Sequence, residues 1–507
     1  MASRKEQKKS SSRRHRDRIS GLTDDVLGHV LSFLPTKEAA RAAALSRRWR
    51  HVFGSVHTIS FEETKGERAY DWYTYYVQAL ERKSCSTKLL DDVNAALLCH
   101  RHCAGLPVPP RSLRFAFDKW HWWDKVAVDQ WLSYVAPRRH VGRLPELHLD
   151  MCFYLGPICT ASDSDIDSSD DDAAADDDDD SSGAGSGSDE ETKWRYLLPP
   201  RLLSCAALRT LCITDCRFKL GRTTLTIDLP VLETMRLTAL GDSGESIQCL
   251  ISSCPRLADL TLEALWNLKR ISVLDKRLRR FSLRCCHDLK SAIIDAAELK
   301  LLDYRGMVPA GSLLSLHGLP AIIPSCTIDF CRPLSKEAQF VRFRDFLDKI
   351  QGVAHLRLHH QSLESKFFGV AGFPLFSSLT RLTLQGCIQT HQTHHSVDAL
   401  RMVLEQTPNL ELLTLLMERS KEAYGDINVP ASILSIPCLR HRVREIAMEN
   451  YEGLKPEKRL AKLLLRNALV LERLHVVFAK EIKPEQKNIL EAEMGKWGVA
   501  NSENIFV

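Results

Sequence analysis

The sequence has no run of roughly 18 apolar residues, so it predicts no transmembrane helix. No apolar stretch of about 7–15 residues follows the basic N-terminus, so no secretory signal can be read there. Glycine and proline number only 24 and 21, which excludes a collagen-like or wholly disordered chain. We therefore expect a soluble globular protein whose 507 residues suffice for several folding units.

The sequence also lacks the C-x-x-C spacing of common zinc sites. We predict no metal or cofactor, because two groups of metal-binding residue types have no second ligand pair beside them. These groups are Cys99, His100, His102 and Cys103, and His391, His394 and His395. The 16 cysteines are scattered and mostly follow or precede apolar residues, which predicts reduced and largely buried thiols.

No motif of a known catalytic site is present, neither G-x-S-x-G, nor a phosphate-binding loop, nor H-E-x-x-H. We therefore predict a protein that is not an enzyme, although a triad formed in space stays open at this point. The net charge is +5, but residues 162–192 hold 14 acidic and no basic residues. The basic remainder is not clustered with aromatic residues, so neither nucleic acid nor a membrane is expected as a partner.

Composition divides the chain into six segments. They are a disordered basic tail at 1–17, a helical domain at 18–54, a connector with the first repeats at 55–161, a disordered acidic insertion at 162–192, a repeat region at 193–430, and a C-terminal repeat or cap at 431–507. The acidic insertion is interpreted as a segment without a binding role. The alternative is that it competes for a basic partner or for the basic surface of this chain.

The second segment shows the periodicity of three short helices. Thr23 is placed to cap the first helix, Pro35 to end it, and Thr36 to cap the second. About 35 residues are too few to sustain a core alone, so the apolar stripes need another surface. That surface is either the rest of this chain or a partner protein.

The segment DRISGLTDDVLGHVLSFLP at 17–35, followed by LSRRWR at 45–50, resembles the F-box of plant F-box proteins with leucine-rich repeats. The resemblance implies that these helices dock on the Skp adaptor and, through it, on the cullin of a ubiquitin ligase. By the same resemblance, the adaptor contact consists of Leu22, Thr23, Leu27, Leu31, Leu34, Pro35, Leu45 and Trp49. The family's usual Leu-Pro pair is Leu22-Thr23 here, and a capping residue can replace that proline.

The connector is rich in aromatic residues, around 71–76 and 120–123, and core packing is favoured over base stacking for them. Trp120 to Trp131 is interpreted as an amphipathic helix that packs Val126, Val128, Trp131, Leu132 and Val135 inward.

From Leu144 onward, a phrase of three apolar residues recurs at positions i, i+3 and i+5. Successive central residues from Leu211 to Leu302 are 24, 25, 21 and 21 residues apart, which is the leucine-rich-repeat period. The predicted fold class is therefore α/β: a three-helix F-box followed by an irregular solenoid of short parallel strands with helical returns. The central residues are Leu147, Leu211, Met235, Leu260, Phe281, Leu302, Leu382, Leu413, Ile446 and Leu474.

Residues 438–474 resemble, more loosely, the FBD region at the end of many plant F-box proteins. Their pattern predicts a strand, a helix from about Pro456 to Asn467, and a second strand that caps the solenoid.

The resemblance implies a substrate receptor of an SCF-type ubiquitin ligase, whose repeats hold an unknown target protein. Two alternatives stay open: a repeat scaffold with weak or no adaptor binding, and an enzyme with an unrecognised site. The expected location is the nucleus, the cytoplasm, or both. The sequence identifies neither the target nor any small molecule bound by the repeats.

Overall fold

The computed structural model divides into two compact units, Met1–Asp150 and Met151–Val507. Several segments named in the sequence analysis lie outside the residues that the structure describes. They are the predicted basic tail, the acidic insertion, the aromatic groups around 71–76 and 120–123, and nearly all of the two histidine and cysteine groups. The described residues are 19–62, 87–99, 111–117, 124–135, 144–152, 195–218, 227–274, 276–331, 337–362, 372–387, 400–418, 436–497 and 503–506.

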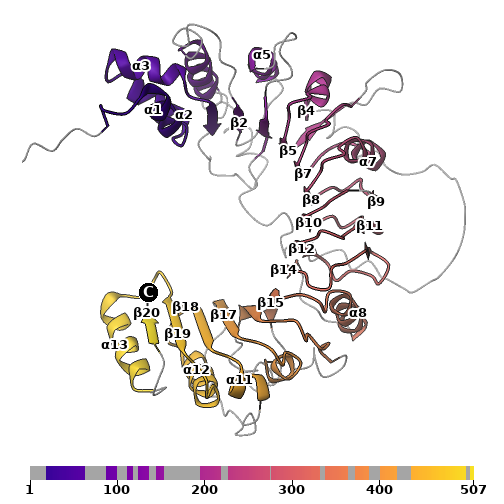
Figure 1. Ribbon diagram of the computed structural model, residues 1–507, viewed down its shortest axis with the longest axis vertical. Helices are drawn as coiled ribbons and strands as arrows, with labels where there is room; N and C mark the ends of the chain where they lie inside the picture. Colours follow the sequence, from indigo (N-terminus) through magenta and orange to yellow (C-terminus); the bar gives the residue numbers. More distant parts are fainter. Residues whose placement is uncertain are drawn as a thin grey trace, which may run out of the picture. The chain divides into compact units, whose positions relative to one another are not determined.

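The first unit contains three short helices followed by parallel strands (Figure 1). A further helix spans residues 87–99. Strand β2 lies between β1 and β3, and both pairings are parallel. The named elements are α1 (Asp24–Leu31), α2 (Thr36–Ala43), α3 (Arg47–Gly54), β1 (Thr58–Glu62), β2 (Ser112–Ala116), α5 (Lys125–Val135) and β3 (Glu146–Asp150).

The three helices are as predicted, but two of the predicted caps act differently. Thr23 occupies the N-cap position of α1 without a side-chain hydrogen bond to the helix. Pro35, not Thr36, is the N-cap of α2. The Thr36 hydroxyl instead accepts a hydrogen bond from the Ser60 amide at 2.7 Å, which ties α2 to β1. Tertiary structure therefore outweighs the local capping preference at Thr36.

The predicted helix of the connector is present as α5, which begins at Lys125. Val128, Trp131 and Leu132 are buried as expected. Val126 is 67% exposed, so its predicted inward position is wrong. The buried residues Asp124, Val128, Trp131 and Leu132 are spaced i, i+4, i+7 and i+8, which leaves Val126 on the opposite side of the helix.

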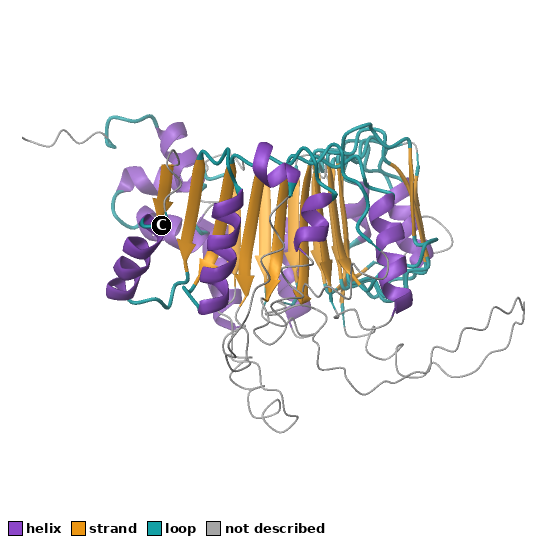
Figure 2. Ribbon diagram, turned by 90° about the horizontal axis from the view of Figure 1, so that it is seen from below, coloured by secondary structure: helices purple, strands orange, loops and turns teal. Residues whose placement is uncertain are grey.

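The second unit is built on a parallel sheet of twelve strands among the described residues, in which each strand lies beside the next in the solenoid (Figure 2). Their order is β5 (Thr210–Thr214), β7 (Thr234–Thr238), β8 (Asp259–Glu263), β10 (Arg280–Arg284), β12 (Leu301–Gly306), β14 (Ser325–Phe330), β15 (His355–Ser362), β16 (Arg381–Cys387), β17 (Leu412–Glu418), β18 (Glu445–Tyr451), β19 (Arg473–Phe478) and β20 (Glu503–Phe506).

The predicted repeat phrases coincide with strands, and their central residues pair with one another in register. Leu211 pairs with Met235, Met235 with Leu260, and so on to Leu302. The same holds from Leu382 to Leu474. The parallel solenoid is thereby confirmed, with inward side chains stacked into one continuous core.

The returns between strands are only partly helical, which corrects the prediction. Helices α7 (Gly244–Ser252) and α8 (Glu337–Asp348) occupy steps of 25 and 30 residues between strand centres. In the next three steps after α7, of 21, 21 and 24 residues, a second parallel sheet takes their place. Its strands are β9 (Arg270–Val273), β11 (Ser291–Asp295) and β13 (Leu314–His317). Shorter elements elsewhere in this unit are β4 (Tyr196–Leu197), η3 (Pro200–Ser204) and β6 (Cys216–Arg217).

The C-terminal region follows the predicted order of strand, helix and strand. The short helix α11 (Pro437–His441) precedes β18, and helix α12 (Lys455–Asn467) lies between β18 and β19. Helix α13 (Pro484–Gly495) and strand β20 come after it, so β20 and not β19 forms the final edge of the sheet.

The described cysteines form no disulfide, and most of them are buried, as predicted. In the described part of the chain, no helix combines the length and the apolar character needed to cross a membrane.

Candidate binding surfaces

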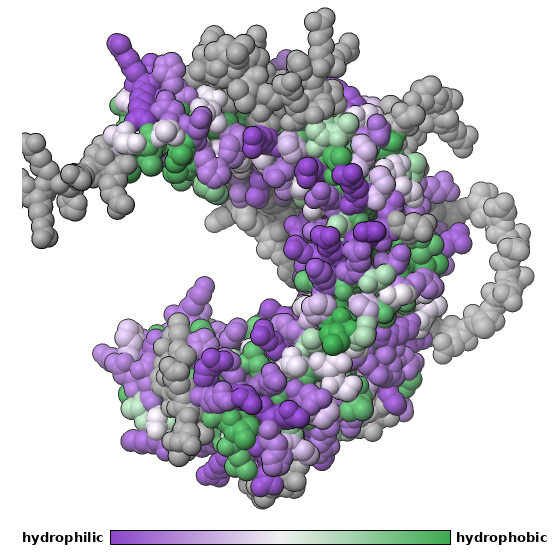
Figure 3. Space-filling model, viewed as in Figure 1, coloured by the Kyte–Doolittle hydropathy of each residue, from purple (hydrophilic) through white to green (hydrophobic). Residues whose placement is uncertain are grey.

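The three N-terminal helices expose a set of large hydrophobic side chains. Phe33 and Leu45 are 76% and 77% exposed, which is unusual for such residues when they lie together on one small domain. Figure 3 shows hydrophobic side chains at the surface of this part of the molecule. We call the set the outer apolar surface; it consists of Ile19, Leu22, Val26, Val30, Phe33, Leu34 and Leu45.

The structure separates the predicted adaptor-binding residues into two groups. Leu22, Leu34 and Leu45 belong to the outer apolar surface, Thr23 and Pro35 are exposed beside it, and Trp49 is half-buried. Leu27 and Leu31 are only 2% and 3% exposed.

The positions of Leu27 and Leu31 correct the expectation that they line a partner directly. They lie on the inner stripe of α1, and the described core of this unit also buries Val52, Phe53 and Ile59. The rest of the chain covers the inner stripe, and the outer stripe is left exposed.

Arg48 holds the segment before α1 in place. Its guanidinium donates to the Asp24 carboxylate at 2.8 Å and to the Ser20 carbonyl at 2.5 Å, and it also donates to the Leu22 carbonyl. Leu22 therefore has a defined position although it is exposed. Sequence reasoning missed this role of Arg48, because a contact between residues 24 positions apart leaves no local signal.

In the second unit, helices α7, α8, α11 and α12 cover one face of the sheet (Figure 1). The opposite face, which we call the open face, presents alternate residues of each strand. On β10 to β15 it carries ion pairs between neighbouring strands. Arg284 Nε lies 2.9 Å from Asp303 Oδ2, and Asp329 lies 3.2 Å from Arg305 Nε and 2.6 Å from His359 Nδ1.

Positive charge on β15 and β16 is not offset by ion pairs in the described part of the open face. Arg357 and Arg381 are exposed on β15 and β16, and within the described ranges no carboxylate forms an ion pair with either. His355 is the register partner of Arg381, and its pKa is lowered by burial and by the two nearby guanidinium groups. Arg357 donates to Gln385 at 2.9 Å. This part of the face suits a partner that carries negative charge.

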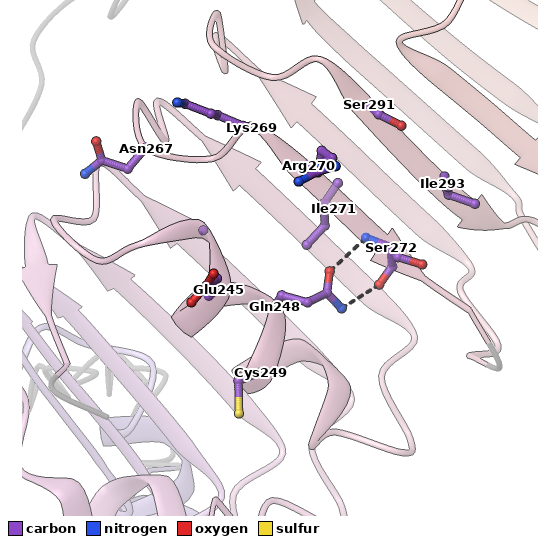
Figure 4. A pocket seen from close by; sticks show the side chains of 11 residues that line it. Glu245, Gln248, Cys249, Asn267, Lys269, Arg270, Ile271, Ser272, Ser291 and Ile293 are labelled. Carbon is purple, nitrogen blue, oxygen red and sulfur yellow. Dashed lines mark hydrogen bonds between the residues drawn. The ribbon is translucent and has the colours of Figure 1, made fainter. Parts of the chain in front are cut away.

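A cavity of about 780 Å³ lies between α7 and the second sheet (Figure 4). Gln248 forms two hydrogen bonds of 2.8 Å with the Ser272 backbone and so completes the edge of β9. Glu245, Cys249 and Lys269 also line the cavity, but they lie apart from one another (Figure 4). The residues that line the cavity do not place a nucleophile in contact with a base. The cavity therefore supports binding or packing and not covalent chemistry.

Two family models match the chain. The model of the F-box domain matches residues 19–60, which contain α1 to α3 and the outer apolar surface. The model described as FBD-associated F-box protein At5g56370, LRR repeats, matches residues 188–313, which contain strands β5 to β12. The chain therefore contains an F-box domain followed by leucine-rich repeats of the FBD-associated type.

Curated relatives extend this similarity over most of the chain. F-box/LRR-repeat protein At4g14103 of Arabidopsis thaliana is 25% identical over 430 residues, covering 81% of this chain and 95% of the relative. F-box/LRR-repeat protein At3g59200 of the same plant is 25% identical over 510 residues, covering 92% and 84%. F-box/LRR-repeat protein At3g59190 is 26% identical over 454 residues, covering 84% and 96%.

Proposed function

We propose that this chain is the substrate-recognition subunit of an SCF-type ubiquitin ligase. The F-box binds a Skp-type adaptor, the adaptor links the chain to cullin, and the leucine-rich repeats hold a target protein. The chain then contributes binding and not covalent chemistry, because holding the target near the conjugating enzyme raises the effective concentration of its lysines. The nucleus and the cytoplasm are the proposed locations.

The outer apolar surface is the observation that carries this proposal. Full burial of a leucine or phenylalanine side chain contributes about 1.5–3 kcal/mol, so a few such residues suffice for a stable complex after the cost of association. The adaptor contact accordingly centres on Phe33, Leu34 and Leu45, while Leu27 and Leu31 support it from within.

The open face of the sheet is the proposed target surface. It presents Arg357 and Arg381 beside the half-buried His355. We expect the target to contribute acidic residues to this contact, because complementary charge speeds association and excludes wrong partners.

Binding of the full-length chain to a purified Skp adaptor, measured by calorimetry, tests the proposal. Phe33→Asp and Leu45→Asp place a charge on the outer apolar surface, and each should weaken binding by at least about 30-fold, or about 2 kcal/mol. Val126→Asp is the matched control, because Val126 is a similarly exposed apolar residue of the same unit outside the F-box. It should bind like the unmodified chain.

Two results would contradict the proposal. The first is that the unmodified chain forms no complex with the adaptor, which would favour the repeat-scaffold alternative. The second is that both F-box variants bind the adaptor as tightly as Val126→Asp does. Leu31→Asp does not serve as the test, since Leu31 is buried and a charge there would unfold the domain.

A further inference from the structure

The turn that follows each of several strands is built in the same way. Asp215, Ala239, Ala264 and Cys285 directly follow β5, β7, β8 and β10, and all four have φ between 50° and 52°. The amide of each donates to a carbonyl at the end of the next strand; Cys285, for example, donates to Arg305 at 2.6 Å. Position 285 is therefore a fixed point of the solenoid, and its side chain is 1% exposed.

Cys331 lies at the end of the strand two places farther along the sheet, in a turn that differs from that of Cys285 because its amide donates to the preceding strand β12. It directly follows β14, is buried, and donates its amide to the Gly306 carbonyl at 3.0 Å. Between the two cysteines, the intervening strand β12 ends in Gly306, which has no side chain to separate them. The Sγ atoms of Cys285 and Cys331 lie 3.5 Å apart.

His287 completes the group from the same turn as Cys285. It is half-buried, and its ring lies against that of Trp266 with the centroids 5.8 Å apart. One side-chain nitrogen of His287 and the two cysteine sulfurs all lie within 4.8 Å of one another.

We propose that Cys285, His287 and Cys331 together bind a zinc ion that joins the ends of β10 and β14. Zinc bonds of about 2.3 Å to sulfur and 2.0–2.1 Å to nitrogen place tetrahedral ligand atoms roughly 3.4–3.8 Å apart, so a closing movement of about 1 Å suffices. Two thiolates and a neutral imidazole balance the charge of the ion. Thiolate ligands also select zinc over magnesium and calcium.

The surroundings suit such a site. Arg305 lies against both thiols, hydrogen-bonds Cys331 and forms an ion pair with Asp329 at 3.2 Å. A cavity of about 390 Å³, lined by His287, Tyr304 and Arg305 among others, lies beside the group. It gives the ion a path of entry and leaves room for water as the fourth ligand.

The site was not predicted from sequence, because its ligands lack the usual spacing. Cys285 and His287 are neighbours in the chain, but Cys331 is 46 positions from Cys285 and reaches it only through the stacking of repeats.

The test uses the full-length chain, purified under reducing conditions without chelator. We expect a single zinc ion per chain by elemental analysis at this site, and thiolate-to-cobalt charge-transfer absorption when the stripped protein is loaded with Co²⁺. Cys285→Ala and Cys331→Ser should each weaken zinc binding by more than about 100-fold. Cys249→Ser, at an exposed thiol outside the group, is the control and should retain the ion.

Cys285→Ala should keep its fold, because Ala239 and Ala264 already occupy the equivalent turns with the same backbone conformation. Circular dichroism of the variant checks this. The proposal would be overturned by the absence of the cobalt-thiolate bands in the folded, reduced chain. It would equally be overturned by unchanged metal content and spectra in Cys285→Ala, or by a Cys285–Cys331 disulfide in the reduced preparation.

Discussion

A buried carboxyl group couples the stability of the repeats to pH. Asp242 precedes α7, and both of its oxygens accept the Phe218 amide at 2.9–3.0 Å. Burial raises the pKa of this carboxyl to about 7, even though the amide and two arginines oppose the shift. The group is therefore largely protonated in the folded chain below pH 7, whereas it ionises near pH 4 when unfolded.

The resulting prediction concerns the free energy of unfolding between pH 4 and pH 7. As pH rises through this range the unfolded state loses the proton first, so this group should reduce stability by an amount on the order of 2 kcal/mol. Asp242→Asn should remove that slope. Urea unfolding at pH 5 and pH 7.5 measures it, with Asp228→Asn at an exposed carboxylate as the control. An unchanged slope in Asp242→Asn would refute the assignment.

Single residues were predicted unevenly. The apolar positions of the F-box were identified as a set, but helical periodicity does not say which of two adjacent stripes faces the core. Leu27 and Leu31 are inside, whereas Val26, Val30 and Phe33 are outside. Interactions between distant residues, such as Arg48 with the segment before α1, left no trace in the local pattern.

At the scale of elements, the turn before α12 depends on one glycine. Gly453 has φ 75°, and a Cβ at this position would overlap the Leu490 side chain of α13. Its amide, with those of Glu452 and Leu454, donates to the Glu457 carboxylate at 2.8–3.1 Å. The glycine therefore lets α12, α13 and the preceding turn approach one another.

We predict that Gly453→Ala destabilises the C-terminal region by about 1–3 kcal/mol, through the left-handed backbone and the contact with α13. Gly311→Ala is the matched control, because a methyl group added to Gly311 would meet no atom within 4 Å and the φ of this residue is not positive. Thermal unfolding of both variants provides the comparison. Equal melting temperatures would show that α13 does not pack on the turn as described.

The strands were the most predictable elements, because each inward side chain repeats the spacing of its neighbour. Three strands were missed although they carry the same spacing: β1 with Val56, Ile59 and Phe61, β14, and β15 with Val353, Leu356 and Leu358. Their residues satisfy the apolar spacing of the phrase, except that Cys326 is the central residue of β14, so the sequence pattern itself contains these strands. The segments that connect one strand to the next, including β9, β11 and β13, could not be predicted from the repeated apolar spacing. That spacing describes only the inward residues of the main sheet.

At the scale of the whole molecule, the two units carry different kinds of surface. The F-box exposes apolar side chains, as expected of a stable protein contact, whereas the open face of the repeats is charged. This division agrees with the proposed roles, one surface for a constant adaptor and the other for a specific target. The class of protein could be predicted from its motifs, but the target could not, because no local rule converts the open face into a ligand.

Hydrogen exchange of the full-length chain, with and without a saturating Skp adaptor, tests the central claim most directly. The account predicts slower exchange within residues 19–54, around the outer apolar surface, and unchanged exchange in β14 to β16, which stay available for the target. Protection of those repeat strands by the adaptor, or no protection within the F-box, would contradict it.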